Sequence, residues 1–149
     1  MPKMRTLCLI ILLSLFTLAV SSSADDDGVW TYEPSGNEAS VTGCVDACPT
    51  DLVIPATING YSVTEIGYRA FSNSQLTSVT IPDSVTIIGG FAFDNNKIAQ
   101  VEIPNGVTHI VSAFNNNQLS NVTIPASVIR LGGFSNNQLT SVTIPDNVV

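Results

Sequence analysis

The chain has 149 residues, of which 44% are hydrophobic and 11% charged, and its formal net charge at pH 7 is −7. This length suits a single domain. An acidic chain repels phosphate backbones and anionic headgroups, so we expect neither nucleic acids nor membrane surfaces among its partners.

Residues 1–24 have the layout of a secretory signal peptide. Two positive charges in MPKMR precede the apolar run TLCLIILLSLFTLAV, and small side chains at Ser22 and Ala24 precede a cut before Asp25. A retained membrane anchor is the alternative, but about 20 apolar residues are usual for a span and this run is shorter. Cleavage would remove two of the five basic residues and none of the 12 acidic ones, which leaves residues 25–149 with a formal net charge of −9. We therefore expect a secreted or cell-surface protein without membrane insertion after signal removal.

Residues 25–52 are predicted to form an amino-terminal cap. The stretch GVWTYEPSGNEASVTGC predicts two short strands around PSGN, a hairpin that would cover the first coil of the following repeats. Trp30 and Tyr32 are expected to be packing residues of this hairpin and not a sugar-binding platform.

Two cysteines follow in the same region, Cys44 and Cys48. Outside the cell an even pair is normally oxidised. Zinc would need four ligands, and after cleavage only His109 could join the two thiols. A redox motif would have two residues between the cysteines. The sequence therefore predicts a structural disulfide.

Residues 53–149 repeat a pattern every 20 to 22 residues, which predicts a stacked solenoid whose units bury their apolar faces against one another. Four phenylalanines are each followed by asparagine after two residues, leucine or isoleucine after five, valine after eight, isoleucine after ten and proline after eleven. The phenylalanines are Phe71, Phe93, Phe114 and Phe134; the valines are Val79, Val101, Val122 and Val142; the isoleucines are Ile81, Ile103, Ile124 and Ile144; the prolines are Pro82, Pro104, Pro125 and Pro145.

The alternation valine–polar–isoleucine predicts a short strand with one buried face, which the following proline ends. Equivalent strands would stack in parallel, about 4.8 Å apart. No segment has a helical period, so the predicted fold is an all-β-rich solenoid with a hairpin-like cap. The pattern ends partway through a unit, with Val148 at the first apolar position of the next half-coil. We expect an incomplete last repeat, and either a truncated longer protein or self-association through an uncapped carboxy-terminal edge.

Length varies only between each proline and the next phenylalanine, a segment that loses one residue from each unit to the next. The loss of residues in a turn should leave the buried positions of successive units aligned with one another. Gly67, Gly89 and Gly132 are expected to give this turn backbone freedom. His109 lies in the same variable half and is predicted to be an exposed turn residue.

The asparagines two residues after each phenylalanine allow two interpretations. They could form an internal ladder that satisfies turn backbone groups between coils, or they could occupy tight turns in solvent. The column consists of Asn73, Asn95, Asn116 and Asn136.

The repeated LTSVTIPDSV…IG…AF resembles BspA-type leucine-rich repeats, and TGC…CPTDLVIPATINGY is similar to the amino-terminal section of many secreted bacterial members. The resemblance covers residues 41–149. It implies a curved leucine-rich repeat solenoid on the cell surface or outside the cell, in a family whose members are often adhesins or protein-binding surface proteins. It implies no enzymatic activity and no cofactor.

The residue inventory agrees with that expectation. The mature chain has one histidine and one lysine, Lys97, and no serine or cysteine in the context of an activated nucleophile. We therefore expect no enzyme, no metal and no cofactor.

The candidate binding face consists of the outward positions of the predicted strands. They form two polar columns, seven and nine residues after each phenylalanine, that present a regular surface for a protein or glycan partner. A structural or assembly segment of a longer surface protein is the alternative function. The candidate residues are Ser78, Thr80, Gln100, Glu102, Asn121, Thr123, Ser141 and Thr143.

Overall fold

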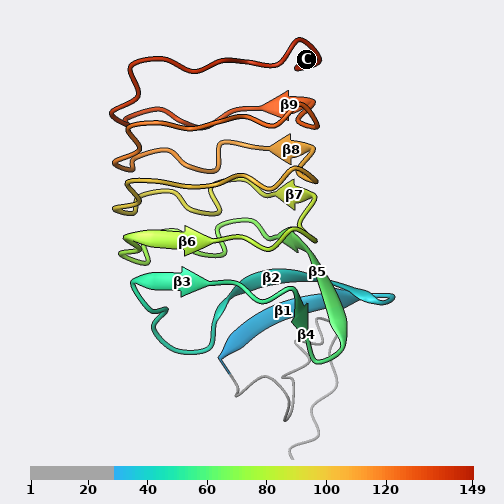
Figure 1. Cartoon of the computed structure of the whole chain (residues 1–149). Helices are drawn as coiled ribbons and strands as arrows, with labels where there is room; N and C mark the ends of the chain where they lie inside the picture. The colour runs from blue at the N-terminus through green and yellow to red at the C-terminus, as the bar shows by residue number, and fades with distance from the viewer. Residues whose placement is uncertain (1–28) are drawn as a thin grey trace, which may run out of the picture.

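The computed structural model describes residues 29–149, so the predicted signal peptide lies outside the described residues. The described chain is a β-solenoid whose coils stack one above another (Figure 1), and it contains no helix. This confirms the predicted fold class. The strands are β1 (Trp30–Ser35), β2 (Glu38–Cys44), β3 (Asp51–Val53), β4 (Thr57–Ile58), β5 (Tyr61–Ile66), β6 (Ser78–Thr80), β7 (Ile87–Ile88), β8 (His109–Ile110) and β9 (Arg130–Leu131).

The first two strands form the expected hairpin cap. β1 pairs antiparallel with β2, and β2 pairs in parallel with β5, so the hairpin continues the sheet of the solenoid (Figure 1). Trp30 packs edge-on against Phe71 with the ring centroids 6.2 Å apart. Tyr32 packs against Tyr61 at 6.0 Å. Both aromatic side chains of the hairpin thus contact the repeats directly.

A single sheet runs along the solenoid, on the half of each coil that follows the proline. β5, β7, β8 and β9 pair in parallel, and Ile66, Ile88, Ile110 and Leu131 occupy one register. The valine–polar–isoleucine segments, together with the equivalent Asp-Leu-Val-Ile of residues 51–54, are called here the V-x-I legs, and their outward surface is called the V-x-I face. The legs are residues 51–54, 78–81, 100–103, 121–124 and 141–144. They were predicted to carry the coil-to-coil pairing, but only β3 and β6 pair there. The prediction is therefore confirmed for the first two legs and wrong for the other three.

The main chains of neighbouring coils approach closely at two of these pairings, β2–β5 and β5–β7. Gly67 and Gly89 directly follow the inward isoleucines, and neither has a positive φ. A Cβ on Gly89 would lie 2.7 Å from the main-chain oxygen of Ile66, and one on Gly67 would lie 3.0 Å from that of Val41. These two glycines are therefore needed for contact between coils, and not for the backbone freedom that we expected; Gly132 also lacks a positive φ.

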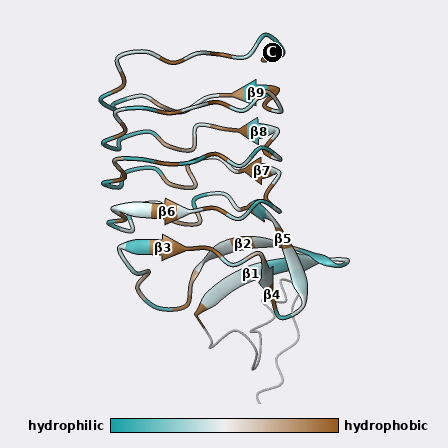
Figure 2. Ribbon diagram, in the orientation of Figure 1, coloured by the Kyte–Doolittle hydropathy of each residue, from teal (hydrophilic) through white to brown (hydrophobic). Residues whose placement is uncertain are grey.

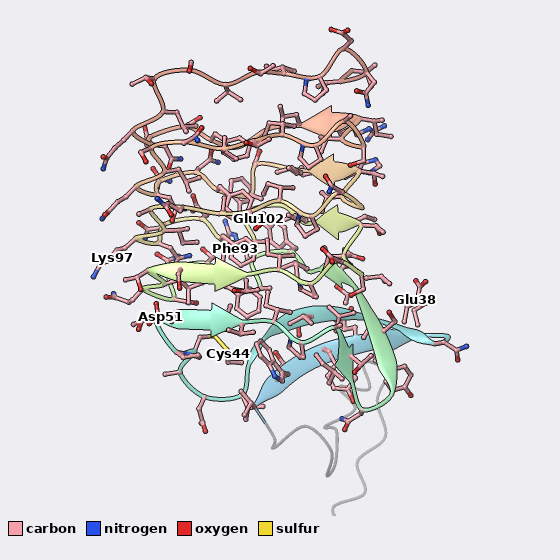
Figure 3. The ribbon with its side chains drawn as sticks, viewed as in Figure 1. Glu38, Cys44, Asp51, Phe93, Lys97 and Glu102 are labelled. Atoms are coloured by element: carbon pink, nitrogen blue, oxygen red, sulfur yellow. A yellow bond between two sulfur atoms is a disulfide. The ribbon has the colours of Figure 1, made fainter. Side chains whose placement is uncertain are left out.

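The core lies between the two halves of each coil, where four phenylalanines stack ring on ring. Figure 3 shows Phe93 inside the stack of coils. Hydrophobic and hydrophilic stretches alternate along each coil (Figure 2), as the repeated core positions require. The valines and isoleucines of the V-x-I legs complete the cluster, with Val79, Ile81, Ile103, Val122 and Ile124 buried. The stacked pairs are Phe71–Phe93 at 5.5 Å, Phe93–Phe114 at 5.1 Å and Phe114–Phe134 at 5.6 Å.

The turn before each phenylalanine accommodates the loss of one residue from each unit to the next, as predicted. The inward residues of β7, β8 and β9 stay in register and the phenylalanines stay stacked, although the segment between them shortens. Left-handed residues occur in each of these turns: Arg69, Phe91, Ser112 and Gly133.

Gly133 is expected to be the least replaceable glycine of these turns. Its φ is +92°, and a Cβ there would overlap main-chain atoms of Ser112 and Ala113. Gly133→Ala should therefore lower the free energy of unfolding by about 2 kcal/mol, measured by chemical denaturation. Gly36→Ala is the control, because Gly36 has a φ of +62° but no atom within 4 Å of a built Cβ. Equal losses in the two variants would contradict the steric argument.

Candidate functional site

The eight predicted face residues are all exposed. They point outward from the V-x-I legs, alternating with the inward valines and isoleucines. The predicted pair of polar columns is therefore present as a surface; whether it binds a ligand stays a prediction.

A shallow depression of about 620 Å³ lies in the middle of this surface. Gln100, Glu102, Asn121 and Thr123 line it, so the structure brings together four of the eight predicted residues. The other four, Ser78, Thr80, Ser141 and Thr143, lie outside its lining. Asp83 and Asn105, which sequence reasoning did not select, also line it. Both directly follow a proline that ends a V-x-I leg, and this common offset is the signal that would have found them.

The main chain around the depression is unpaired between coils. Within residues 29–149, no main-chain hydrogen bond joins residues 101–103 to the legs on either side, 79–81 and 122–124. The nearest such bonds lie at the beginnings of the legs, for example from the Gln118 nitrogen to the Ile98 oxygen at 3.0 Å. Backbone donors and acceptors therefore add to the polar side chains of this surface.

The depression carries negative charge without a neighbouring cation. Asp83 and Glu102 are its ionisable lining residues. The three basic residues of the described chain lie elsewhere. Lys97 donates from Nζ to the Gln75 Oε1 at 3.1 Å and extends from the edge of the coils (Figure 3), while Arg130 belongs to β9.

The remaining basic residue, Arg69, lies against two aromatic rings. Its guanidinium carbon is 5.3 Å from the centroid of Tyr68 and 5.6 Å from that of Phe91. The basic residues are thus separated from the two carboxylates of the depression, which can accept hydrogen bonds from donor groups of a ligand.

The exposed asparagine column matches the second of the earlier interpretations, asparagines in tight turns at the surface, and not the internal ladder. Asn73, Asn95, Asn116 and Asn136 have φ values of 55° to 59°, the left-handed conformation of a tight turn. They also make side-chain hydrogen bonds between coils at the surface: Asn95 donates to Asn73, Asn136 donates to Asn116, and Asn116 donates to Asp94 and not to Asn95. These side chains are not the ones that satisfy the turn backbone internally.

The internal ladder belongs to the next residue along the chain, which sequence reasoning missed. Asn96, Asn117 and Asn137 follow the phenylalanines by three residues, and Asn96 and Asn117 are buried. The Asn117 Oδ1 accepts from the Ile98 nitrogen at 3.0 Å, and its Nδ2 donates to the Phe93 oxygen at 2.8 Å. Asn96 and Asn137 make the equivalent contacts. The doubled asparagine in three of the four units was the available signal.

His109 does not occupy the exposed turn that we predicted. It lies in β8, is partly buried, and its Nδ1 is 2.9 Å from the Thr108 Oγ1. The adjacent threonines form a further ladder, in which Thr86 donates to the Thr64 oxygen at 3.2 Å and Thr108 donates to the Thr86 oxygen at 3.0 Å. This histidine is therefore part of the sheet that runs along the solenoid.

A disulfide joins Cys44 and Cys48. A second depression, of about 420 Å³, lies beside it and includes Thr31, Asp46 and Gln75 in its lining. Among residues 29–149 no three histidine, cysteine, aspartate or glutamate side chains lie close enough together to hold a metal ion. The same part of the chain has no helix that is long and apolar enough to cross a membrane.

Comparison with known proteins supplies the family context. The model described as "BspA type Leucine rich repeat region (6 copies)" matches residues 50–149. None of the curated proteins compared with this chain gives a significant match. Among solved structures, the chain is similar to a leucine-rich repeat protein from Bacteroides ovatus ATCC 8483, with 28% identity and a TM-score of 0.69 over 80% of this chain and 35% of that one. It is also similar to the T. pallidum leucine-rich repeat protein, with 25% identity and a TM-score of 0.69 over 81% of this chain and 60% of that one. The chain thus spans about a third and about three fifths of these two proteins.

Proposed function

The chain belongs to the family of BspA-type leucine-rich repeat proteins, and from this premise we propose that it is a non-enzymatic recognition module, secreted or exposed at the cell surface. It binds a protein or glycan partner through the V-x-I face. The repeated coils present an extended surface, which is how solenoid proteins bind their partners.

Two features support the secreted location, one before the predicted cleavage point in the sequence and one after it. Residues 1–24 have the charged, apolar and small-residue regions of a signal peptide. The Cys44–Cys48 disulfide is of the kind that persists in oxidising compartments.

One observation carries the binding proposal: four residues of the polar columns line a single depression whose surrounding main chain is unpaired. The lining offers hydroxyl, amide and carboxylate groups and contains no histidine, cysteine, lysine or serine. Such a set suits hydrogen bonding to peptide groups or sugar hydroxyls. The depression is therefore proposed as the centre of a binding surface.

A matched pair of glutamines tests this surface. Gln100 lines the depression, whereas Gln118 is equally an exposed glutamine but lies outside it. The purified chain would be applied to a glycan array and to immobilised collagen, fibronectin and mucin. For the probe that binds, Gln100→Arg should weaken binding about tenfold, the effect of losing one central contact worth about 1.4 kcal/mol, and Gln118→Arg should leave the affinity unchanged.

The proposal has two ways to fail in this experiment. If none of these probes binds at micromolar concentration, the recognition role of this chain is contradicted. If Gln118→Arg weakens binding as much as Gln100→Arg, binding occurs but the V-x-I face is not its location.

A further inference from the structure

We propose that Asn105 is a site of spontaneous deamidation, a modification that places an additional carboxylate in the depression. The chain contains two asparagine–glycine pairs, Asn59–Gly60 and Asn105–Gly106. Glycine as the following residue favours this reaction because it has no Cβ to hinder attack by its own nitrogen. The two pairs differ in the exposure of the asparagine and in the hydrogen bonding of its side chain.

The chemistry needs only water. The main-chain nitrogen of Gly106 forms a bond to the side-chain carbonyl carbon of Asn105, and the side-chain nitrogen leaves as ammonia with the proton of the attacking N–H. Water then opens the cyclic imide at one of its two carbonyl carbons and yields aspartate or isoaspartate. One water is consumed and one ammonia is released.

Asn105 is accessible to solvent, and its side chain is not restrained by hydrogen bonds within the described part of the chain. Asn105 and Gly106 are both exposed, and they occupy the middle of a turn closed by a hydrogen bond from the Val107 nitrogen to the Pro104 oxygen at 3.0 Å. Within residues 29–149 the Asn105 side chain makes no hydrogen bond to the protein. Its carbonyl carbon can therefore reach the Gly106 nitrogen after rearrangement of one turn.

Asn59 is held in place by comparison. It is half-buried, and its Nδ2 donates to the Tyr32 hydroxyl at 2.8 Å. It also lies in the tight turn between β4 and β5, where Ile58 pairs with Tyr61. Attack at this residue requires the side-chain hydrogen bond to break and the hairpin to open.

The repeat itself shows that an aspartate is tolerated in place of Asn105. The equivalent position after the proline is Asp83 in the preceding coil and Asp146 in the last, both exposed. The aspartate product thus gives this turn the acidic residue that two other turns already have, whereas the isoaspartate product carries its carboxylate on a main chain lengthened by one carbon. The product carboxylate joins Asp83 and Glu102 around the depression, so it makes this surface more negative.

Peptide mapping tests the proposal on the purified folded chain, without reference to any ligand. Trypsin cleaves after Arg69, Lys97 and Arg130, which places Asn59 and Asn105 on different peptides. After incubation at mildly alkaline pH, tandem mass spectrometry locates the amide-to-carboxylate change. We expect it about tenfold faster at Asn105 than at Asn59, the factor given by about 1.4 kcal/mol of added barrier from one hydrogen bond.

Two variants and a denatured sample complete the experiment. Asn105→Gln should abolish the change on residues 98–130, and Asn105→Asp should fold with wild-type stability. In denaturant both pairs should react at similar rates. The proposal is overturned if Asn105 keeps its amide in the folded chain while the denatured chain converts, or if Asn59 reacts as fast as Asn105 in the folded chain. Neither outcome depends on whether the depression binds a partner, so this test and the binding test fail independently.

Discussion

Replacement of Phe93 by alanine is expected to lower the free energy of unfolding by about 4 kcal/mol, because it opens a cavity in the middle of the core. Phe93 is fully buried and stacks on both sides, on Phe71 at an interplanar angle of 16° and on Phe114 at 11°. Its removal breaks two aromatic contacts, each worth about 1 kcal/mol beyond the buried area. Chemical denaturation followed by the fluorescence of Trp30, the one tryptophan of the chain, measures the loss.

Phe91 provides the matched control, two residues earlier in the same turn. It is only partly buried and contacts Tyr68 at 6.1 Å and Arg69, outside the stack of phenylalanines. Phe91→Ala should cost about 1 kcal/mol. If the two alanine variants lose similar stability, the phenylalanine stack is not the main source of cohesion between coils.

Asn117→Ala is expected to cost about 3 kcal/mol, nearly as much as a large core residue, although only one polar side chain is lost. The side chain is 7% exposed and bonds to main-chain groups of two successive coils. Alanine leaves the Ile98 N–H buried without its partner, which costs about 1 to 3 kcal/mol. It also removes one of the two amide donors to the Phe93 carbonyl, which keeps only the hydrogen bond from the Asn96 Nδ2. Thermal and chemical unfolding of the purified variant measure this effect.

The adjacent asparagine separates the internal ladder from the surface one. Asn116→Gly keeps the left-handed turn, since glycine adopts the φ of +55° without strain, and removes only exposed side-chain bonds. Its stability should stay within about 0.5 kcal/mol of the wild type. Asn117→Ser adds a second test, because a shorter hydroxyl side chain cannot reach both coils. Wild-type stability of Asn117→Ser would contradict the structural role of the buried amide.

The side-chain pattern predicted which residues are buried, but not which main-chain segments pair. Val79 and Ile81 point inward as their alternation required. Pairing depends instead on the distance between neighbouring backbones. Gly67 and Gly89 mark two close approaches on the other half of the coil, but β8 also pairs there, with Val111 at the equivalent position. Strands as short as β7 and β8, with two residues each, contain too little alternation to be found. For the same reason the sheet position of His109 was missed.

The candidate site was predictable in its surface positions and not in its depression. Outward residues such as Gln100 and Thr123 follow from the register alone. The contributions of Asp83 and Asn105 depend on how the turns of successive coils meet, which one unit of the repeat does not specify. The internal ladder was hidden for a simpler reason: Ser74 replaces asparagine in the first unit, whereas the exposed column begins there with Asn73 and is unbroken.

Within residues 29–149, main-chain hydrogen bonds join successive coils along the sheet and around the phenylalanine turns, but not along the later V-x-I legs. Along β5, β7, β8 and β9, parallel main-chain bonds tie each coil to the next, so stretching this side must break them. Between residues 101–103 and 122–124 no such bond resists separation. Bending should therefore act mainly by spreading or closing these legs, because both the sheet and the phenylalanine turns carry bonds between coils, for example from the Asn95 nitrogen to the Asn115 oxygen at 3.1 Å. A force applied along the stack should first change the width of the depression. The face that we propose for binding is therefore the most easily deformed side of the solenoid.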